Sequence, residues 1–364
     1  MGEAQDLQAQ IHEEAKEANS PENADISHRS RVPQLRDYTW WLRMAIYTLS
    51  LLSGQSVALL WGRLYFDKGG KSKWMATLVQ TAGFPVLLPF YISPTKNKPT
   101  NNDHTKPPSA LTLASLYVFL GVFLVAVAML YSIGLLNLPV STYSLVCASQ
   151  LGFNALFSYF LNSQKFTPFI VNFLVLLTIS STLIGFLCTV GASAGYALMI
   201  SLTQLSYQKI LKSENFGVVL DMIIYQSVVA TGAILVGLFA SREWKGLKEE
   251  MGEFELGKVS YIMTLVWEAI SWQVFSVGAV GLIFEVSSLF SNVISTLGLA
   301  IAPVLAVFVF HDKMDGVKVT AMLLAIWGFV SYIYQHYLDD LNSKAKTRSE
   351  NGNGASEVSL VERG

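Results

Sequence analysis

Long stretches without a charged residue limit most strongly how this chain can fold. Seven such runs occur, at residues 44–62, 74–95, 107–164, 166–208, 222–241, 286–310 and 319–338. An apolar, uncharged stretch of about 18 residues can cross a lipid bilayer as an α-helix. Only 14% of the 364 residues are charged, whereas soluble domains carry about 25%. The pattern excludes a soluble enzyme, a nucleic-acid-binding domain and an outer-membrane barrel with short alternating strands. It predicts an all-α integral membrane protein.

The two ends of the chain have a different composition. Residues 1–37 and 339–364 are polar and mixed in charge, which predicts disordered N-terminal and C-terminal tails. Cys147 and Cys188 lie inside apolar runs, so we expect no extracellular disulfide. The sequence has no paired metal-ligand motif, no Asp-rich diphosphate motif and no Walker lysine loop. We therefore expect no metal, no cofactor, no enzymatic activity and no ATP-driven pumping.

The uncharged runs divide into ten predicted membrane spans. These are residues 44–62, 74–92, two spans within 110–162 that separate at Asn137-Leu138-Pro139, then 167–183, 185–207, 217–240, 259–281, 285–310 and 317–338. A single helix over residues 166–208 would be roughly 64 Å long, about twice the hydrocarbon thickness. Spans five and six are therefore predicted to form a shortened hairpin with almost no connecting loop. A count of nine spans remains open on this evidence. With either count, Lys and Arg are more numerous on the N-terminal side, which predicts a cytoplasmic N-terminus.

Similar short segments recur in the same order in the two halves of the chain. Residues 131–134 (Tyr-Ser-Ile-Gly) are similar to residues 275–278 (Phe-Ser-Val-Gly), and Gln80 corresponds in the same way to Gln226. This order predicts two five-helix repeats, over residues 38–183 and 184–338. An odd number of spans per repeat inverts the second repeat relative to the first. Inverted repeats are typical of secondary transporters, whose substrate site lies between the repeats near the membrane midplane. The repeat favours ten spans over nine.

Glu268 is the clearest charged residue inside a predicted span. A carboxyl group in the membrane usually faces a cavity or a partner, and desolvation disfavours its charged form. Trp272 lies one helical turn further along, on the same face. We interpret Glu268 as a candidate proton-coupling residue. The alternative is a protonated side chain that forms a structural hydrogen bond between helices.

Uncharged amides and aromatic rings are the other candidate functional side chains in the spans. Asn and Gln can read the donor and acceptor edge of a planar heteroaromatic ligand, and aromatic rings can stack on its faces. The candidate substrate-binding residues are Gln55, Tyr131, Gln150, Asn154, Tyr196, Trp272, Gln273 and Asn292. For each amide, the alternative is a hydrogen bond that joins two helices. Apart from helix ends, no Lys or Arg lies inside a span. A phosphorylated substrate would need such residues, so a neutral or weakly cationic substrate is favoured.

Several segments resemble the plant purine permeases. They are GRLYFDKGG at residues 62–70, KWMATLVQ at 73–80, SWQVF at 271–275, GLIFEVSSLFSNVIS at 281–295 and FHDKM at 310–314. The resemblance extends from about residue 38 to residue 340. It implies a ten-helix member of the drug/metabolite transporter superfamily and proton-coupled uptake of purine bases and related compounds, including cytokinins and some alkaloids. The family usually has a polar loop between spans five and six, whereas here residues 180–183 run directly into the next apolar segment.

These observations lead to one main expectation and one alternative. We expect a secondary transporter in the plasma membrane that imports purine-like heteroaromatic compounds with protons by alternating access. Its partners are then a small-molecule substrate, protons and the lipid bilayer, and no nucleic acid; the sequence makes no prediction about oligomeric state. The alternative is a transport-impaired membrane protein with a regulatory or binding role, because of the shortened region between spans five and six. A channel is less favoured, since no ring of charged residues is evident.

Overall fold

The computed structural model describes residues 32–92, 109–138, 140–162, 183–211 and 216–310, together with the single residues 316, 319 and 323. In these ranges the chain forms helices and no strand. The longer helices are α3 (Val32–Asp67), α4 (Lys73–Ala82), α6 (Ala110–Asn137), α7 (Val140–Cys147), α8 (Gln150–Asn162), α10 (Leu183–Ser206), α11 (Phe216–Ala240), α13 (Lys258–Glu285) and α14 (Ser288–Phe310). The chain divides into two compact units, Met1–Tyr47 and Thr48–Gly364. All contacts described below lie within the second unit.

Five helices are long and apolar enough to cross a membrane. They are Tyr38–Asp67, Ala110–Asn137, Gly217–Ala240, Lys258–Glu285 and Ser288–Phe310, and they correspond to predicted spans one, three, seven, eight and nine. The prediction of an all-helical membrane protein is therefore confirmed for the part of the chain that the structure describes. Residues 163–182 and most of residues 311–338 lie outside that part. The hairpin of spans five and six, the total of ten spans and the inverted repeats stay predictions.

Two predicted spans differ from the sequence expectation because their helices are interrupted. Span two consists of α4, the 3₁₀ turn η1 (Phe84–Leu87) and the short helix α5 (Leu88–Ile92). Pro85 lies at the start of η1, where it has no amide hydrogen to donate to the preceding turn. Span four is divided into α7 and α8 by a turn at residues 148–149. At this turn the amide nitrogens of Ala148 and Ser149 still donate to the carbonyls of Ser144 and Val146. Interrupted helices are common where transporters bind their substrates.

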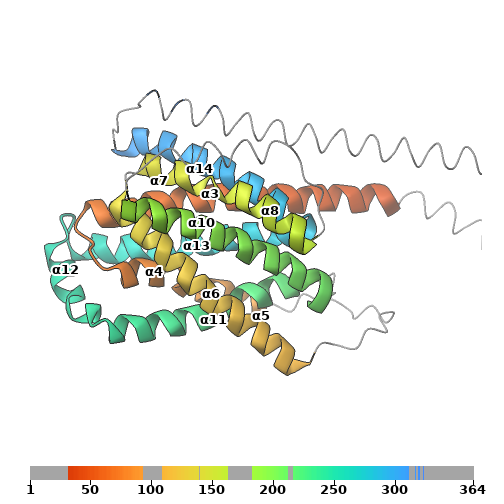
Figure 1. Cartoon of the computed structure of the whole chain (residues 1–364), viewed down its shortest axis with the longest axis horizontal. Coiled ribbons are helices and arrows are strands. Elements are labelled where there is room, and N and C mark those ends of the chain that lie inside the picture. The colour runs from red at the N-terminus through yellow and green to blue at the C-terminus, as the bar shows by residue number, and fades with distance from the viewer. Residues whose placement is uncertain are drawn as a thin grey trace, which may run out of the picture. The chain divides into compact units, whose positions relative to one another are not determined.

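Helices α10, α11 and α13 connect the rest of the bundle. Helix α10 contacts α6, α7, α8, α13 and α14, while α11 contacts α4, α6 and α13; Figure 1 shows α10 running beside α6 and α8. Two glycines bring other helices very close to α13. A Cβ on Gly54 of α3 would collide with the backbone nitrogen of Phe275, and one on Gly83 would collide with the carbonyl oxygen of Ala269. Gly83 directly follows α4, so the lack of a side chain at this position lets α4 end in contact with α13.

The connection between α11 and α13 lies against the connection between α3 and α4. It contains the 3₁₀ turn η4 (Glu243–Lys245) and α12 (Leu247–Glu253). An apolar cluster of Tyr65, Ala76, Phe254 and Tyr261 packs beneath it. Because Tyr65, Ala76 and Tyr261 come from α3, α4 and α13 and Phe254 directly follows α12, the cluster joins the ends of these helices to one another.

Candidate functional site

A cavity of about 110 Å³ lies among the helices of the second unit. One buried water occupies roughly 10–15 Å³ on this measure, so the cavity has room for a small organic molecule. Helices α3, α4, α6, α7, α8, α10, α11, α13 and α14 all contribute side chains to its wall. No charged residue is among the described residues that line it. The cavity therefore suits an uncharged ligand that combines apolar surface with hydrogen-bonding groups.

Five of the sequence-predicted binding residues line the cavity. They are Gln55, Tyr131, Gln150, Tyr196 and Trp272. The aromatic rings make edge contacts with one another: the ring centroids of Tyr131 and Tyr196 are 6.4 Å apart, and those of Trp272 and Phe275 are 5.4 Å apart. In an edge contact one ring presents its edge to the other, so both of its own faces stay uncovered by that partner. Such faces are the surface on which a planar ligand can stack.

Ser295 of α14 holds two of the predicted amides together at the cavity wall. Its Oγ accepts hydrogen bonds from Gln55 Nε2 at 2.9 Å and from Gln150 Nε2 at 3.0 Å. The hydroxyl of Tyr131 donates to Gln150 Oε1 at 3.2 Å. This network joins α3, α6, α8 and α14. Since a hydroxyl has two acceptor positions, both are occupied at Ser295, and its own hydrogen has no acceptor among the described residues.

Three predicted binding residues do not line the cavity and instead bond to neighbouring helices. Asn154 Nδ2 donates to the Ser288 carbonyl at 3.0 Å. Asn292 Nδ2 donates to the Gln150 carbonyl at 2.9 Å. Gln273 Nε2 donates to the Thr81 carbonyl at 3.4 Å. The structure thus gives these three amides the helix-joining contacts that were the alternative interpretation, and their binding role stays an untested prediction.

Glu268 is 3% exposed and lies in α13, one turn before Trp272. It does not line the cavity, although Trp272 does. A Cβ on Gly62 of α3 would lie 2.9 Å from Glu268 Oε1 and 3.2 Å from the side chain of Leu135 in α6. The other carboxyl oxygen, Oε2, is buried and has no hydrogen-bond partner in the part of the chain that the structure describes. Glu268 is therefore enclosed between α3, α6 and α13, one helical turn from the cavity wall.

Several polar residues line the cavity but were not predicted as ligands. The most informative are Gln80 of α4 and Gln226 of α11, and the list continues with Thr81, Thr203, Ser227, Ser276 and Ser295. The sequence signal for the first two was their correspondence in the predicted repeat. The hydroxyl residues carry no such signal, because Ser and Thr are common on buried faces throughout these helices. Among the described residues, no group of three His, Cys, Asp or Glu side chains could hold a metal ion.

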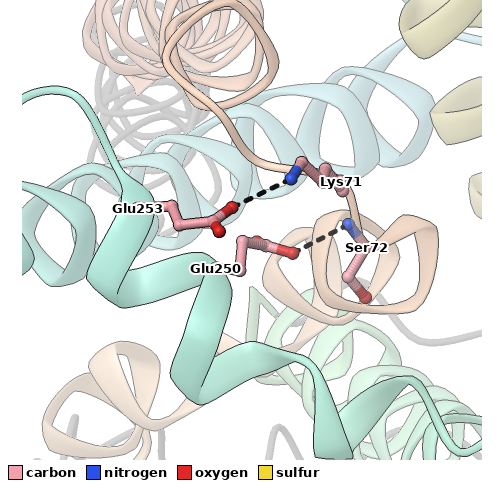
Figure 2. A network of polar contacts seen from close by, with 4 residues as sticks. All are labelled: Lys71, Ser72, Glu250 and Glu253. Atoms are coloured by element: carbon pink, nitrogen blue, oxygen red, sulfur yellow. Dashed lines mark hydrogen bonds and ion pairs between the residues drawn. The ribbon is translucent and has the colours of Figure 1, made fainter.

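A second polar cluster lies at α12, and we call it the α12 clamp. Its centre is the buried carboxylate of Glu250, whose Oε1 accepts from the hydroxyls of Tyr65 at 2.6 Å and Tyr261 at 3.0 Å. Its Oε2 accepts from the backbone nitrogen of Ser72 at 3.2 Å. Figure 2 shows this contact beside the ion pair of Lys71 with Glu253, which is 3.1 Å long. The clamp connects the α3–α4 connection to the α11–α13 connection.

Two exposed ion pairs flank the α12 clamp. Lys71 pairs with Glu253, and Lys68 pairs with Glu255 at 2.8 Å. In each pair the hydrogen bond from the lysine to the glutamate, followed by the attraction of the two charges, raises the pKa of the lysine above its usual value. Exposed pairs of this kind add little to stability. The stronger links between the two connections are therefore those of the buried Glu250 and of Glu243, whose Oε2 accepts from Ser72 Oγ at 2.6 Å.

The family model described as purine nucleobase transmembrane transport matches residues 42–185 and 180–342 of the chain. Among similar proteins, Probable purine permease 10 of Arabidopsis thaliana is 57% identical over 341 residues, which cover 88% of this chain and 87% of that protein. Purine permease 21 of the same plant is 55% identical over 335 residues, with 87% and 86% covered. Probable purine permease 8 is 53% identical over 344 residues, with 89% and 87% covered.

Proposed function

The chain belongs to the purine permease family, and from this premise we propose that it is a secondary active transporter of purine nucleobases. The cavity inside the helical bundle is the observation that carries the proposal. Its wall combines the aromatic side chains of Tyr131, Tyr196 and Trp272 with uncharged amides. A purine base needs both, because its faces stack and its edge forms hydrogen bonds. Related heteroaromatic compounds, including cytokinins and alkaloids, share this chemistry and are proposed as further substrates.

The proposed coupling ion is a proton, and Glu268 is its proposed carrier. A buried charge without a partner is costly, and Glu268 Oε2 has no hydrogen-bond partner among the described residues. A proton is the partner that this carboxyl group can gain and lose. Its place one turn before Trp272 would let its protonation state affect the helix face that contacts the substrate. The competing role is a permanently protonated group that joins helices.

Alternating access is the proposed transport cycle, and import across the plasma membrane is its proposed direction. The interruptions between α4 and α5 and between α7 and α8 support the cycle, because discontinuous helices are common at the substrate sites of secondary transporters. The two predicted inverted repeats would provide the two gates. A cytoplasmic N-terminus, as the Lys and Arg distribution predicts, would place the α12 clamp on the outer side, since α3 crosses the membrane once before reaching it.

The direct test is uptake of labelled adenine by yeast cells that lack their own base uptake. Cells that express the full-length chain should accumulate label, and a protonophore should abolish the accumulation. Surface expression is measured in parallel, and cells with an empty vector provide the background. Absence of uptake despite confirmed surface expression would contradict the proposal. Uptake that a protonophore does not change would contradict proton coupling alone.

The alternative of a transport-impaired membrane protein is supported by one specific observation. The family match falls into two segments, 42–185 and 180–342, which meet where the sequence predicts the shortened hairpin. A chain that lacks part of span five or six could still bind a ligand without completing the cycle. Binding of labelled adenine to membranes in the absence of uptake would distinguish this function from transport.

A further inference from the structure

We propose that Gln80 and Gln226 form a pair of hydrogen-bond acceptors that selects ligands with free N–H groups. This inference rests on the proposed function, because it assumes that the cavity binds a heteroaromatic substrate. The two residues correspond to each other in the predicted repeat, and they line the cavity from α4 and α11. These helices contact each other, and Thr231 Oγ1 donates to Thr81 Oγ1 at 3.0 Å. Both amides therefore belong to the wall that α4, α6 and α11 form, and their partners on α6, Ser132 and Leu120, are twelve residues apart along that helix.

The surroundings of Gln226 determine which way its amide points. Its Nε2 lies 3.4 Å from the carbonyl oxygen of Leu120 and 3.6 Å from the sulfur of Met199. Both neighbours can only accept hydrogen bonds, so the nitrogen must face them. The carbonyl oxygen then points elsewhere, and no described residue donates to it. The neighbouring Ser227 also lines the cavity, and its hydroxyl has no partner in the described part of the chain.

The surroundings of Gln80 lead to the same result. Its Nε2 lies 3.0 Å from Ser132 Oγ and 3.4 Å from the carbonyl oxygen of Ala76. The Ala76 carbonyl can only accept hydrogen bonds. Ser132 Oγ also receives a hydrogen bond from Thr77 Oγ1 at 3.0 Å. The nitrogen of Gln80 is therefore used within the protein. Its carbonyl oxygen receives no hydrogen bond from any described residue.

The other amides at or near the cavity differ in this respect. Gln150 uses both ends of its amide, toward Tyr131 and Ser295. The oxygens of Gln55, Gln273 and Asn292 have no partner but are sealed inside the protein, and of these three residues only Gln55 lines the cavity. The unpartnered oxygens of Gln80 and Gln226 are not among the sealed atoms. They are therefore the amide oxygens best placed to receive hydrogen bonds from a ligand.

Acceptors on this wall require donors on the ligand. A ring N–H or an exocyclic amino group supplies them, and replacement of the hydrogen by a methyl group removes them. On another helix, the hydroxyl hydrogen of Ser295 is available for a ring nitrogen of the ligand. The predicted ligand class is thus a purine with at least one free N–H and at least one unprotonated ring nitrogen. Methylation at the N–H positions should weaken binding.

The test measures competition for labelled adenine uptake in the yeast assay. Unlabelled adenine is compared with 9-methyladenine and with N6,N6-dimethyladenine, and the ratio of their inhibition constants is recorded. For the wild-type chain we expect at least one methylated compound to compete about tenfold less well, the loss expected for a hydrogen bond in a buried site. The variants Gln80→Leu and Gln226→Leu should reduce that ratio severalfold. Gln208→Leu, on an exposed side chain, is the matched control and should keep the ratio.

The ratio separates ligand selection from a purely structural role. Loss of a structural contact would weaken adenine and the methylated compounds together and leave the ratio unchanged, and that result would overturn the inference. Equal competition by all compounds in the wild-type chain would also overturn it while leaving the proposed function intact. If a leucine variant fails to reach the surface, the wild-type series decides the question. Absence of any uptake by the wild-type chain would instead overturn the proposed function, and this inference with it.

Discussion

Replacing Glu250 should weaken the contact between the two connections that the α12 clamp joins. The Glu250 carboxylate is 6% exposed and accepts three hydrogen bonds, from the Tyr65 and Tyr261 hydroxyls and from the backbone of Ser72. Tyr65 is completely buried, and Tyr261 is 3% exposed. Removal of the carboxylate therefore leaves the Tyr261 hydroxyl without its acceptor, and it leaves the Tyr65 hydroxyl only the Ser72 carbonyl, at 3.3 Å.

The size of the effect follows from the number and kind of the lost bonds. A hydrogen bond to a charged group contributes about 1.5–3 kcal/mol, and a buried donor left without its acceptor costs about 1–3 kcal/mol. We expect Glu250→Ala to destabilise the protein by about 3–5 kcal/mol. Glu250→Gln keeps an oxygen acceptor but loses the charge, so its cost should be about 1–2 kcal/mol. The specific prediction is that stability increases in the order Glu250→Ala, Glu250→Gln, wild type.

The assay is thermal unfolding of the full-length protein in lipid nanodiscs, followed by tryptophan fluorescence at one fixed heating rate. The fixed rate is needed because the midpoint of an irreversible transition depends on it. The matched control is Glu253→Gln, which removes only the exposed pair with Lys71 and should change the midpoint little. If Glu250→Ala and Glu253→Gln shifted the midpoint equally, the clamp would not carry the energy that its burial and bonds imply.

Three further predictions concern the cavity and its surroundings. Glu268→Gln should abolish the dependence of adenine uptake on external pH, because an amide cannot exchange a proton there. Glu249→Gln, on an exposed side chain, should keep this pH dependence. Full pH dependence in Glu268→Gln would show that Glu268 does not couple proton movement to transport. Trp272→Leu should raise the KM for adenine by about tenfold or more, since base stacking on an aromatic ring contributes about 1–3 kcal/mol, whereas Trp272→Phe should retain part of the affinity. Gly83→Val should lower the unfolding midpoint and surface expression, because its side chain would collide with Ala269 and Gln273 of α13; a stable, fully expressed Gly83→Val protein would contradict this packing.

The helices could be predicted from the sequence because charge is expensive in a membrane. The charge-free runs at 222–241 and 286–310 correspond closely to α11 and α14. Pro85 indicates an interruption in the sequence, because proline has no amide hydrogen to donate. The uncharged run that contains Pro85 was nevertheless predicted to be one continuous span. The turn at residues 148–149 carries no proline or glycine, and it became visible only in the structure. Hydropathy reports where the chain is apolar, and it does not report where a helix breaks inside the membrane.

The types of residue that form the candidate site could be predicted from the sequence, but the individual residues could be predicted much less well. Five of the eight proposed binding residues line the cavity, since aromatic and amide side chains are the chemistry that such a cavity needs. Asn154, Gln273 and Asn292 have the same chemistry but bond to neighbouring helices. Their partners are backbone carbonyls of residues distant in the sequence. No local pattern identifies such a partner.

The difference between Gln150 and Gln226 shows what decides whether an intramembrane amide is available to a ligand. Each amide has an oxygen and a nitrogen to satisfy, and a neighbouring helix can satisfy one or both. Gln150 meets a donor, Tyr131, and an acceptor, Ser295, so both ends of its amide have a partner within the protein. Gln226 meets two acceptors, Leu120 and Met199, so its oxygen is left over. Because an unsatisfied polar atom in a membrane is costly, a leftover oxygen that lines a cavity implies that a ligand or water completes it. Incomplete hydrogen bonding at a cavity wall is therefore a stronger indication of substrate contact than the presence of an amide in a span.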